Sequence, residues 1–234
     1  MTTFALVHGS WHGAWCWELL TPLLEQGGHE VVAVELPSHD PSVSFDGYAE
    51  VVCAALDVRD DVVLVGHSMA GHTIPLVAAR RPVRHLVYLC AVVPEVGCSL
   101  ADQMRDDVHM LNPMYAPGLS EPDAELRQRW VDHRLAQSVL FGDCADDVAH
   151  AAIERLRPQA LYPLANRFAL DAFPATPCTY VVCNDDSLVN PDWSRRVARD
   201  RLGADVVEMP GSHSPFLSRP AQLADVLSAL ANDP

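Results

Sequence analysis

Residues 62–71 read Val-Val-Leu-Val-Gly-His-Ser-Met-Ala-Gly. The apolar, mainly β-branched start of this stretch predicts a buried strand, and the small residues after it predict a tight turn into a helix. A serine on such a turn, called a nucleophile elbow, projects its hydroxyl above the carboxyl end of a sheet. The stretch departs from a strict Gly-x-Ser-x-Gly pattern, because Ala70 stands at the second glycine position and Gly71 follows it. The pattern therefore predicts that Ser68 is a nucleophile.

Similar apolar runs recur along the chain and alternate with segments of helical spacing. Strands are predicted at residues 3–8, 30–35, 61–65, 84–91, 178–183 and 204–209. Helical segments lie between them, for example at residues 15–24, 48–56, 74–79 and 191–202. This alternation is typical of parallel strands whose crossover helices cover both faces of the sheet. The sequence therefore predicts an α/β fold with a doubly wound, mostly parallel sheet, and its 234 residues suit a single domain, 1–234.

The alternation stops between residues 94 and 166, where helical spacing continues without a convincing strand. We interpret residues 94–166 as a small helical cap inserted after the fourth strand. That position puts the cap over the carboxyl ends of the strands, where ligands of open α/β sheets bind. Trp130 and Phe141 of the cap, together with Trp11, are expected to line the substrate pocket. The alternative is a second packed layer of helices that does not contact substrate.

A serine nucleophile needs a base that removes its proton and an acid that orients the base. With a serine on this kind of turn, the acid and then the histidine follow along the chain. His213 is the best-placed histidine, because it lies in a loop between the last predicted strand and the last helix. His67 and His72 flank the turn, but they are too close in sequence to approach Ser68 from the opposite side. We therefore expect His213 to be the base.

The acid is expected in the loop after the strand at residues 178–183, where residues 184–189 read Asn-Asp-Asp-Ser-Leu-Val. Successive side chains that leave a strand point in opposite directions, so only one of the two aspartates can face His213. Asp186 is favoured, because an aspartate followed by two residues and then a buried apolar residue is the commoner arrangement in this architecture. Asp185 remains the alternative.

Donors for a developing oxyanion are expected at two backbone N–H groups. One is the amide of Met69, directly after the nucleophile, and the other is the amide of Ser10 in the glycine-rich loop after the first strand. His8 and His12 lie in the same loop and resemble a metal-binding pair. They lack a third ligand at useful spacing, so we predict no metal site.

Composition restricts the classes of function. The net charge is −15, and all 16 basic residues are arginines, so a Schiff base or a lysine general base is excluded. Scattered arginines on an acidic chain also argue against nucleic-acid binding. The seven cysteines form no Cys-x-x-Cys pair and fit buried free thiols in a reducing compartment. Without a signal peptide or a membrane-length apolar run, the sequence predicts a cytoplasmic protein that does not bind membranes.

The chain resembles the plant methylesterase and hydroxynitrile lyase group of α/β-hydrolases and its bacterial esterase relatives. The match rests on Val-His-Gly-Ser-Trp-His-Gly-Ala-Trp-Cys-Trp at residues 7–17, on the elbow at 66–71, and on the aspartate and histidine loops. It covers most of the chain outside residues 94–166. The resemblance implies an α/β-hydrolase core with a small helical cap, no cofactor, and an esterase or a related carbonyl chemistry. A homodimer is an expectation by analogy with this group alone.

Two positions separate the branches of this group. The hydroxynitrile lyases that resemble the chain carry a threonine after the first-loop histidine and a lysine after the catalytic histidine, where this chain has Gly9 and Ser214. The leading hypothesis is therefore a serine carboxylesterase that cleaves a small, largely apolar or aromatic ester through an acyl-enzyme. The alternatives are a cofactor-independent lyase, or other carbonyl chemistry on a biosynthetic intermediate, at the same site, and a ligand-binding protein with a degraded site.

Overall fold

A six-stranded parallel sheet forms the centre of the computed structural model, which describes residues 1–231. Its strands are β1 (Thr3–Val7), β2 (Glu30–Val34), β3 (Val62–His67), β4 (His85–Leu89), β7 (Cys178–Cys183) and β8 (Asp205–Met209). Their spatial order is β2-β1-β3-β4-β7-β8, and each neighbouring pair is parallel. The chain thus builds outward from β1 in both directions, so the predicted doubly wound α/β sheet is confirmed.

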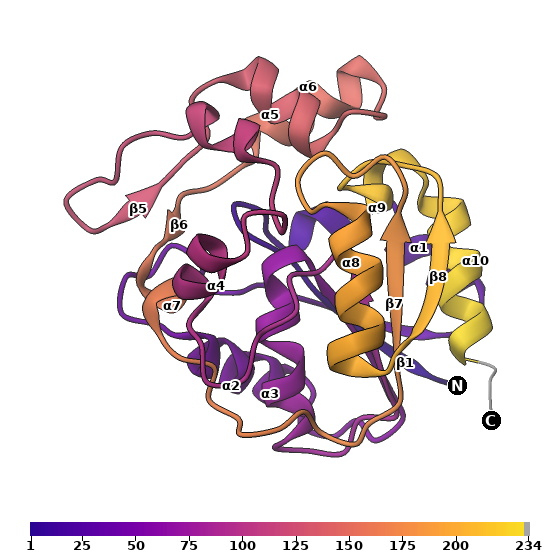
Figure 1. The fold of residues 1–234 in the computed structure, drawn as a ribbon. Helices are drawn as coiled ribbons and strands as arrows, with labels where there is room; N and C mark the ends of the chain where they lie inside the picture. Colours follow the sequence, from indigo (N-terminus) through magenta and orange to yellow (C-terminus); the bar gives the residue numbers. More distant parts are fainter. Residues whose placement is uncertain (232–234) are drawn as a thin grey trace.

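The four central strands β1, β3, β4 and β7 are buried on both faces, which explains why they are largely apolar, whereas the edge strands β2 and β8 are partly exposed. Along β3, Val62 and Leu64 belong to one hydrophobic core, whereas Val63 and Val65 belong to a second core on the opposite face. The first core includes residues of α2 (Phe45–Ala55), α3 (Ile74–Ala78) and α8 (Pro191–Val197). The second includes residues of η1 (Ala14–Trp17), α1 (Thr21–Gln26) and α10 (Pro220–Ala231). Figure 1 shows α8 and α10 on opposite sides of β7 and β8.

Three short helical segments lie in the connections that follow strands and helices of the main sheet. They are η2 (Ser68–His72), directly after β3, the π-helical turn η4 (Ala198–Leu202), and α9 (Pro215–Ser218). Both η2 and α9 begin where the chain has just left the carboxyl end of a strand. The sheet therefore brings the predicted serine and histidine loops to the same edge of the molecule.

Residues 94–166 contain most of the remaining elements. These are α4 (Leu100–Asp106), η3 (Pro113–Gly118), β5 (Arg127–Gln128), α5 (His133–Leu140), α6 (Asp146–Glu154), β6 (Gln159–Ala160) and α7 (Tyr162–Ala165). Figure 1 shows α5 and α6 beyond the arrowheads of β7 and β8, at the carboxyl end of the sheet. The prediction that this segment lacks strands is wrong, because β5 and β6 form an antiparallel ladder. Two residues per strand are too few to produce a period in the sequence.

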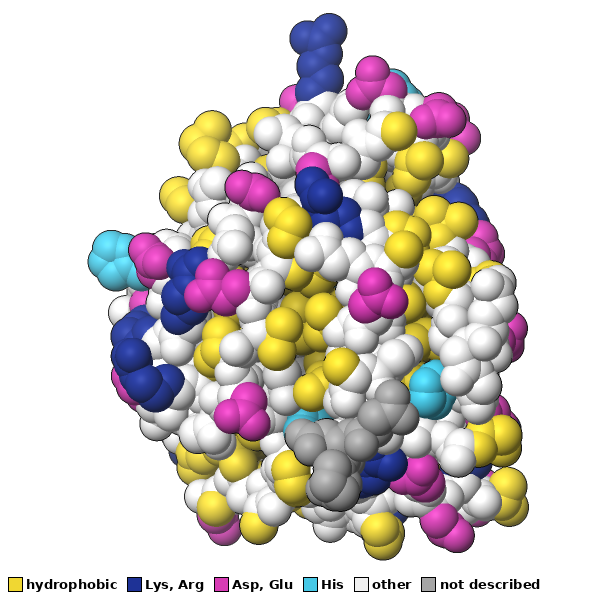
Figure 2. Space-filling view, turned by 90° about the vertical axis from the view of Figure 1, so that its right-hand side faces the viewer, with side chains coloured by type: hydrophobic (Ala, Val, Ile, Leu, Met, Phe, Trp, Pro, Cys, Tyr) yellow, Lys and Arg dark blue, Asp and Glu magenta, His cyan; other side chains and the backbone are white. Residues whose placement is uncertain are grey.

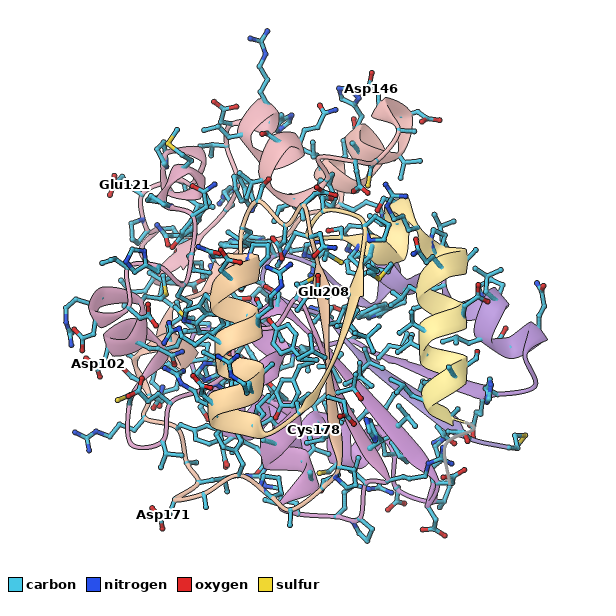
Figure 3. The ribbon with its side chains drawn as sticks, turned by 45° about the vertical axis from the view of Figure 1, so that its right-hand side comes forward. Asp102, Glu121, Asp146, Asp171, Cys178 and Glu208 are labelled. Carbon is cyan, nitrogen blue, oxygen red and sulfur yellow. The ribbon has the colours of Figure 1, made fainter. Side chains whose placement is uncertain are left out.

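The surface mixes charged and apolar side chains. Figure 2 shows acidic and arginine side chains interspersed with apolar ones over the face that it presents. Several arginines pair with carboxylates, as Arg59 does with Glu30 at 2.7 Å and Arg195 with Glu208 at 3.0 Å. Figure 3 places Glu208 over β8, at the surface of the sheet layer. Exposed ion pairs contribute little to stability, so the buried cores dominate it. Among residues 1–231, no helix has both the length and the apolar character needed to cross a membrane.

Candidate active site

Ser68 occupies a strained turn between β3 and η2. Its φ angle is 53°, in the left-handed region that non-glycine residues rarely adopt. A Cβ atom on Gly66 would lie 2.7 Å from Cγ2 of Ile74, and one on Gly71 would collide with the carbonyl oxygen of Val92. The turn thus needs small residues at 66 and 71. The close backbone approach falls at Gly71, which explains why alanine is tolerated at position 70.

The loop after β1 packs directly against this turn. A Cβ atom on Gly9 would lie 2.7 Å from Cβ of Ser68 and 3.0 Å from the carbonyl oxygen of His67. Real Cβ atoms do not approach this closely, so any larger residue at position 9 requires the loop or the turn to shift. The packing around Ser68 therefore requires glycine at position 9.

His213 and Asp186 form a buried hydrogen-bonded pair. Nδ1 of His213 donates to Oδ2 of Asp186 at 2.9 Å, and the two side chains are 1% and 3% exposed. A carboxylate accepts but does not donate, so the proton of the neutral imidazole lies on Nδ1 and Nε2 is left as the basic atom. Oδ1 of Asp186 accepts from the amides of Leu188 and Val189, at 2.8 and 3.0 Å. The carboxylate is thereby fixed in position.

Asp185, the alternative acid, binds elsewhere. Its Oδ2 accepts from the amide of Gly211 at 3.2 Å, and its own amide donates to the carbonyl of Gly211 at 3.0 Å. These bonds join the loop after β7 to the loop after β8. The structure therefore brings Asp186, and not Asp185, to His213.

His67 links the serine turn to the histidine loop. Its Nε2 donates to the backbone carbonyl of His213 at 2.8 Å, and the two rings lie 4.6 Å apart between centroids. Burial holds the pKa of His67 well below its ordinary value, so this imidazole is neutral. His67 directly precedes Ser68, so its bond to His213 holds the histidine loop against the serine turn. The sequence suggested only that His67 is not the base, and gave no sign of this positioning role.

The loop that carries Ser10 is held by two neutral histidines. Nδ1 of His12 donates to the carbonyl of Ser10 at 2.8 Å, and Nδ1 of His8 donates to the carbonyl of Gly9 at 2.9 Å. Nε2 of His8 accepts from the amide of Leu36 at 3.1 Å. Burial lowers the pKa of His8 to about 3 and that of His12 to about 4. The pair that resembles a metal motif therefore supports the loop as uncharged hydrogen-bonding groups.

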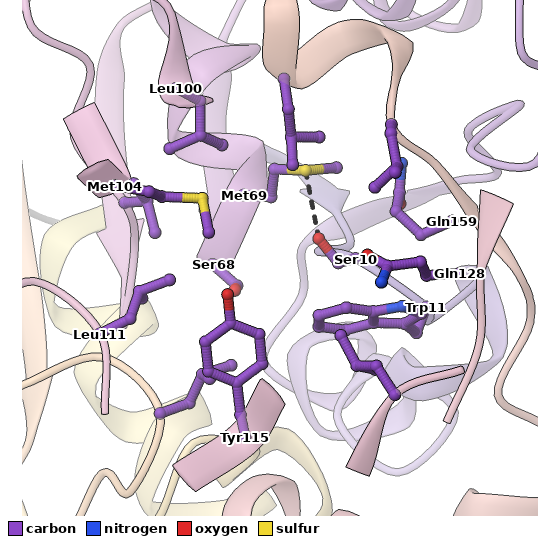
Figure 4. A pocket seen from close by; sticks show the side chains of 15 residues that line it. Ser10, Trp11, Ser68, Met69, Leu100, Met104, Leu111, Tyr115, Gln128 and Gln159 are labelled. Atoms are coloured by element: carbon purple, nitrogen blue, oxygen red, sulfur yellow. Dashed lines mark hydrogen bonds between the residues drawn. The ribbon is translucent and has the colours of Figure 1, made fainter. Parts of the chain in front are cut away.

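The two residues whose amides are the predicted oxyanion donors are in contact through their side chains. Met69 is the second residue of η2, where helical amides have no partner within the helix. Oγ of Ser10 donates to Sδ of Met69 at 3.1 Å, a contact marked in Figure 4. Ser10, Ser68 and Met69 line the same pocket. This arrangement suits stabilisation of a negatively charged oxygen on a carbon attached to Ser68.

Arg157 also fixes this loop, and the sequence gave no signal for it. Its amide donates to the carbonyl of Trp11 at 2.7 Å, and its Nη2 donates to the carbonyl of His12 at 2.8 Å. Trp11 has a φ angle of 62°, a strained value for a tryptophan. The end of the 94–166 segment thus holds the strained loop against the serine turn.

A narrow cavity of about 90 Å³ opens at Ser68. It is lined by Ser10, Trp11, Ser68, Met69, Val92, Leu100, Met104, Leu111, Tyr115, Leu119, Gln128, Gln159, Leu161, Leu164 and Leu188. Figure 4 shows Leu100, Met104 and Leu111 on one side of Ser68, and Ser10, Trp11, Gln128 and Gln159 on the other. None of these lining side chains is charged. The pocket can therefore hold a compact, uncharged ligand with its reactive atom near Ser68.

A family model of the "Alpha/beta hydrolase family" matches residues 4–226. This chain belongs to the α/β-hydrolase family. The hydrolase is similar to Methylesterase 2 of Arabidopsis thaliana, at 28% identity over 98% of this chain and 96% of that protein. It is also similar to the Alpha-hydroxynitrile lyase of Arabidopsis thaliana, at 27% identity over 98% and 97%. The crystal structure of polyneuridine aldehyde esterase has the same fold, with a TM-score of 0.86 and 24% identity over 99% of this chain and 100% of that one. The predicted family and type of enzyme are confirmed.

The pocket predictions for this hydrolase need one correction. Trp11 lines the cavity, but Trp130 and Phe141 do not. The ring of Trp130 packs edge-on against Trp11, with centroids 5.6 Å apart, and that of Phe141 packs against His12 at 5.8 Å. Both belong to the hydrophobic core that joins residues 94–166 to the sheet. These two aromatic side chains fill that core, and leucine and methionine side chains make up most of the cavity lining.

Tyr115, Gln128 and Gln159 line the cavity of the hydrolase and were missed from the sequence. All three come from residues 94–166, whose helical spacing gave no sign of which positions face substrate. Gln128 and Gln159 pair across the β5–β6 ladder, and this pairing joins positions far apart in the chain. No local pattern reports such a pairing.

The thiol of Cys90 lies with Asp186 and His213, and the potential ligand atoms of the three are within 4.8 Å of one another. Burial raises the pKa of this thiol well above its ordinary value, so it stays protonated. A metal needs the thiolate, and the other two residues already bind each other. The cluster fits a buried Asp–His pair packed on a cysteine better than it fits a metal centre.

Proposed function

We propose that this hydrolase is a serine carboxylesterase in which Ser68, His213 and Asp186 act as the catalytic triad. The observation that carries the proposal is the 2.9 Å bond from Nδ1 of His213 to Asp186. This bond leaves Nε2 of His213 as the basic atom. His67 holds that imidazole beside the strained turn that presents Ser68. These contacts support a site in which a base, an orienting acid and a nucleophile meet at one end of an apolar pocket.

In the proposed reaction, Oγ of Ser68 attacks the ester carbonyl carbon while Nε2 of His213 takes the hydroxyl proton. Asp186 stabilises the imidazolium that forms. The carbonyl oxygen becomes an oxyanion, which accepts hydrogen bonds from the amides of Ser10 and Met69. Collapse breaks the bond to the alcohol, which leaves with the proton from His213. Water, activated by the same nitrogen, then hydrolyses the acyl-enzyme and restores Ser68.

The pocket supports a small and largely apolar or aromatic ester. Leucine and methionine side chains make up most of its lining, and its volume is about 90 Å³. One relative is named a methylesterase, which supports a methyl ester as the first substrate class to test.

Lyase chemistry is the second candidate, because the similarity to a hydroxynitrile lyase extends over 98% of this chain. A cyanide leaving group needs a nearby positive charge. Here the residue after His213 is Ser214, which is buried, and none of the described residues that line the cavity carries a charge. Ester hydrolysis, which releases a neutral alcohol, fits these residues better.

We also propose a cytoplasmic location. All seven cysteines are free thiols, and three of them are buried. Unpaired cysteines fit a reducing compartment. A homodimer stays a prediction that rests on the relatives of this hydrolase.

The test of function is the initial rate of hydrolysis of a panel of short-acyl and methyl aromatic esters. We expect the wild-type protein to hydrolyse some of them, and Ser68→Ala and His213→Ala each to lower kcat by about 10⁴-fold or more. Ser138→Ala, at an exposed serine of α5, is the matched control. Full activity of Ser68→Ala would contradict the mechanism. If an organophosphonate labels Ser68 and no ester is hydrolysed, the esterase proposal is wrong and the lyase candidate takes its place.

A further inference from the structure

Two glutamines face the pocket on an otherwise apolar lining. Gln128 of β5 and Gln159 of β6 are directly paired in the antiparallel ladder. Side chains of directly paired residues leave the ladder on the same face, so the two amides are neighbours. Figure 4 shows them together, above Trp11 and beside Ser10. This side of the cavity is polar although it carries no charge.

The hydrogen bonds of Gln159 fix which way its amide points. Nε2 donates to the carbonyl of Ala160 at 3.0 Å and to the hydroxyl of Tyr48 at 3.4 Å. A carbonyl can only accept, so the atom that faces Ala160 must be the nitrogen. Oε1 therefore points elsewhere. This oxygen is buried and has no partner among residues 1–231, and the whole residue is 2% exposed.

Gln128 is half-buried, and its amide is oriented by one hydrogen bond. Its Nε2 donates to the carbonyl of Ser120 at 3.0 Å, which again identifies the nitrogen. Within the described chain, no group is found to donate to its Oε1. Two amide nitrogens thus hold the backbone of residues 94–166, and two amide oxygens are left for a ligand. A buried acceptor without a partner destabilises the protein, so a ligand that supplies a donor gains affinity.

The neutral lining selects the kind of donor. No carboxylate lines the cavity to balance an ammonium group, and a buried cation without a counter-ion is strongly disfavoured. Nε1 of Trp11 is also buried and has no partner in the part of the chain that the structure describes. A hydroxyl can donate to a glutamine oxygen and accept from an indole N–H, whereas an amide N–H can only donate. A hydroxyl therefore fits these unpaired atoms best.

We infer that Gln159 and Gln128, with Trp11, form a hydroxyl-binding subsite, so that the substrate is an ester with a hydroxyl group on a compact aromatic or apolar frame. This inference rests on the proposed esterase function. The ester carbonyl lies at Ser68, and the hydroxyl lies on the side of the pocket where β5 and β6 meet. Gln159 and Gln128 act in specificity and take no part in bond breaking.

The first measurement compares kcat/KM of the wild-type protein for methyl phenylacetate, its three ring-hydroxylated isomers and the matching methoxy esters. A methoxy group keeps the oxygen but lacks the proton that the glutamines need. We expect one hydroxy isomer to exceed both the parent ester and its methoxy analogue by at least about 10-fold. Hydrolysis without any preference for a hydroxy isomer would show that water satisfies the glutamines, and would overturn the inference.

The second measurement assigns the preference to its residues. Methionine matches glutamine in length and lacks the amide, so Gln159→Met and Gln128→Met should each reduce the preference for the hydroxy ester about 10-fold. Gln222→Met, at an exposed glutamine of α10, is the matched control and should keep the wild-type ratio. Each ratio compares two substrates on one sample, so partial loss of folded protein cancels. If Gln159→Met does not fold, the test rests on Gln128→Met alone. An unchanged ratio of kcat/KM for the hydroxy and methoxy esters in Gln128→Met would overturn the inference.

A binding measurement separates the subsite from the chemistry. Calorimetric titration of Ser68→Ala with the preferred hydroxy ester and its methoxy analogue needs no turnover. If the wild-type protein hydrolyses no ester, the proposed function fails, and the hydroxyphenylacetate set is titrated into Ser68→Ala in the same way. A Kd at least about 10-fold lower for one hydroxy ester than for its methoxy analogue supports the subsite. Equal Kd values for every such pair would overturn it.

Discussion

Asp185 and Asp186 are adjacent carboxylates with different hydrogen bonds, and this difference predicts different kinetic effects. In Asp186→Asn, the side-chain oxygen stays on the amides of Leu188 and Val189, because these can only donate. The new NH₂ group then faces Nδ1 of His213 and forces the imidazole proton onto Nε2. The base is lost with little change in shape, so we expect kcat/KM to fall by about 10³–10⁴-fold.

Asp185→Asn is the control for this substitution. Among residues 1–231, the amide of Gly211 is the one donor found for the carboxylate of Asp185, and an asparagine oxygen can keep that bond. We expect kcat/KM to stay within about 3-fold of wild type. Steady-state kinetics on the best ester of the panel measures both variants. If Asp185→Asn shows the larger loss, the assignment of the acid to Asp186 is wrong.

Gly9 has almost no free space, so even a single methyl group there should disturb the chemistry. A Cβ atom at position 9 would lie 2.7 Å from Cβ of Ser68. In Gly9→Ala, either the serine turn or the amide of Ser10 must move, and we expect kcat to fall by about 10²-fold. Ser10→Ala keeps the backbone and removes only the contact from Oγ to Met69, so its loss should be smaller. A kcat for Gly9→Ala equal to that of wild type would contradict the close packing.

At the scale of elements, α4 connects stability with the pocket. Ser99 caps this helix, since its Oγ accepts from the amide of Asp102 at 3.1 Å and Asp102 caps in return. The helix carries Leu100 and Met104, which line the cavity. Ser99→Ala should lower the free energy of unfolding by about 1 kcal/mol and raise KM by loosening the apolar side of the pocket. Urea unfolding and steady-state kinetics measure the two effects, with Ser138→Ala as control; an unchanged unfolding midpoint would contradict the capping role.

The elements differ in how well the sequence predicts them, for physical reasons. The four central strands of the main sheet are buried on both faces, so each is a largely apolar run that stands out locally. The serine turn is also local, because strand, turn and helix are consecutive in residues 62–71. The β5–β6 ladder has no such signal, since it pairs two residues with two others far along the chain. Elements that depend on one short stretch were therefore predictable, and those that depend on distant pairing were not.

For the whole molecule, buried neutral histidines predict a loss of stability in acid. His8, His12 and His72 have pKa values lowered by burial to about 3, 4 and 3, and that of His67 is also lowered. Between these values and the ordinary 6.5, the unfolded chain binds protons that the folded chain does not. Stability is thus complete above pH 6.5 and falls as the pH decreases through this window. Each such histidine lowers the free energy of unfolding by up to about 1.4 kcal/mol per pH unit.

Urea unfolding from about pH 7.5 down to about pH 5 measures this loss. His72→Leu removes one of the buried titrating groups at a position whose Nε2 has no partner among residues 1–231, so its curve should fall less steeply than that of wild type. Urea unfolding needs no turnover, so this readout is separate from catalysis. A wild-type free energy of unfolding that is constant over this range would contradict the prediction.

The candidate site was predictable to the extent that its residues follow strands. Ser68, Asp186 and His213 stand directly after β3, β7 and β8, and parallel strands bring their carboxyl ends together. Trp130 and Phe141 were placed wrongly, because hydrophobic residues of a covering segment can face either its own core or the ligand. The choice depends on how that segment packs on the sheet, which no short stretch of sequence contains.

The proposed catalytic residues and most pocket residues come from different parts of the chain. The proposed catalytic groups come from loops that follow strands of the sheet, whereas the pocket side chains from Leu100 to Leu164 come from residues 94–166. Mutations in that segment can change which molecule is accepted while the reacting groups keep their geometry. Descendants of such a gene can therefore acquire new substrates gradually, without passing through an inactive ancestor. Exchanging the segment between relatives is a direct way to reproduce that history in the laboratory.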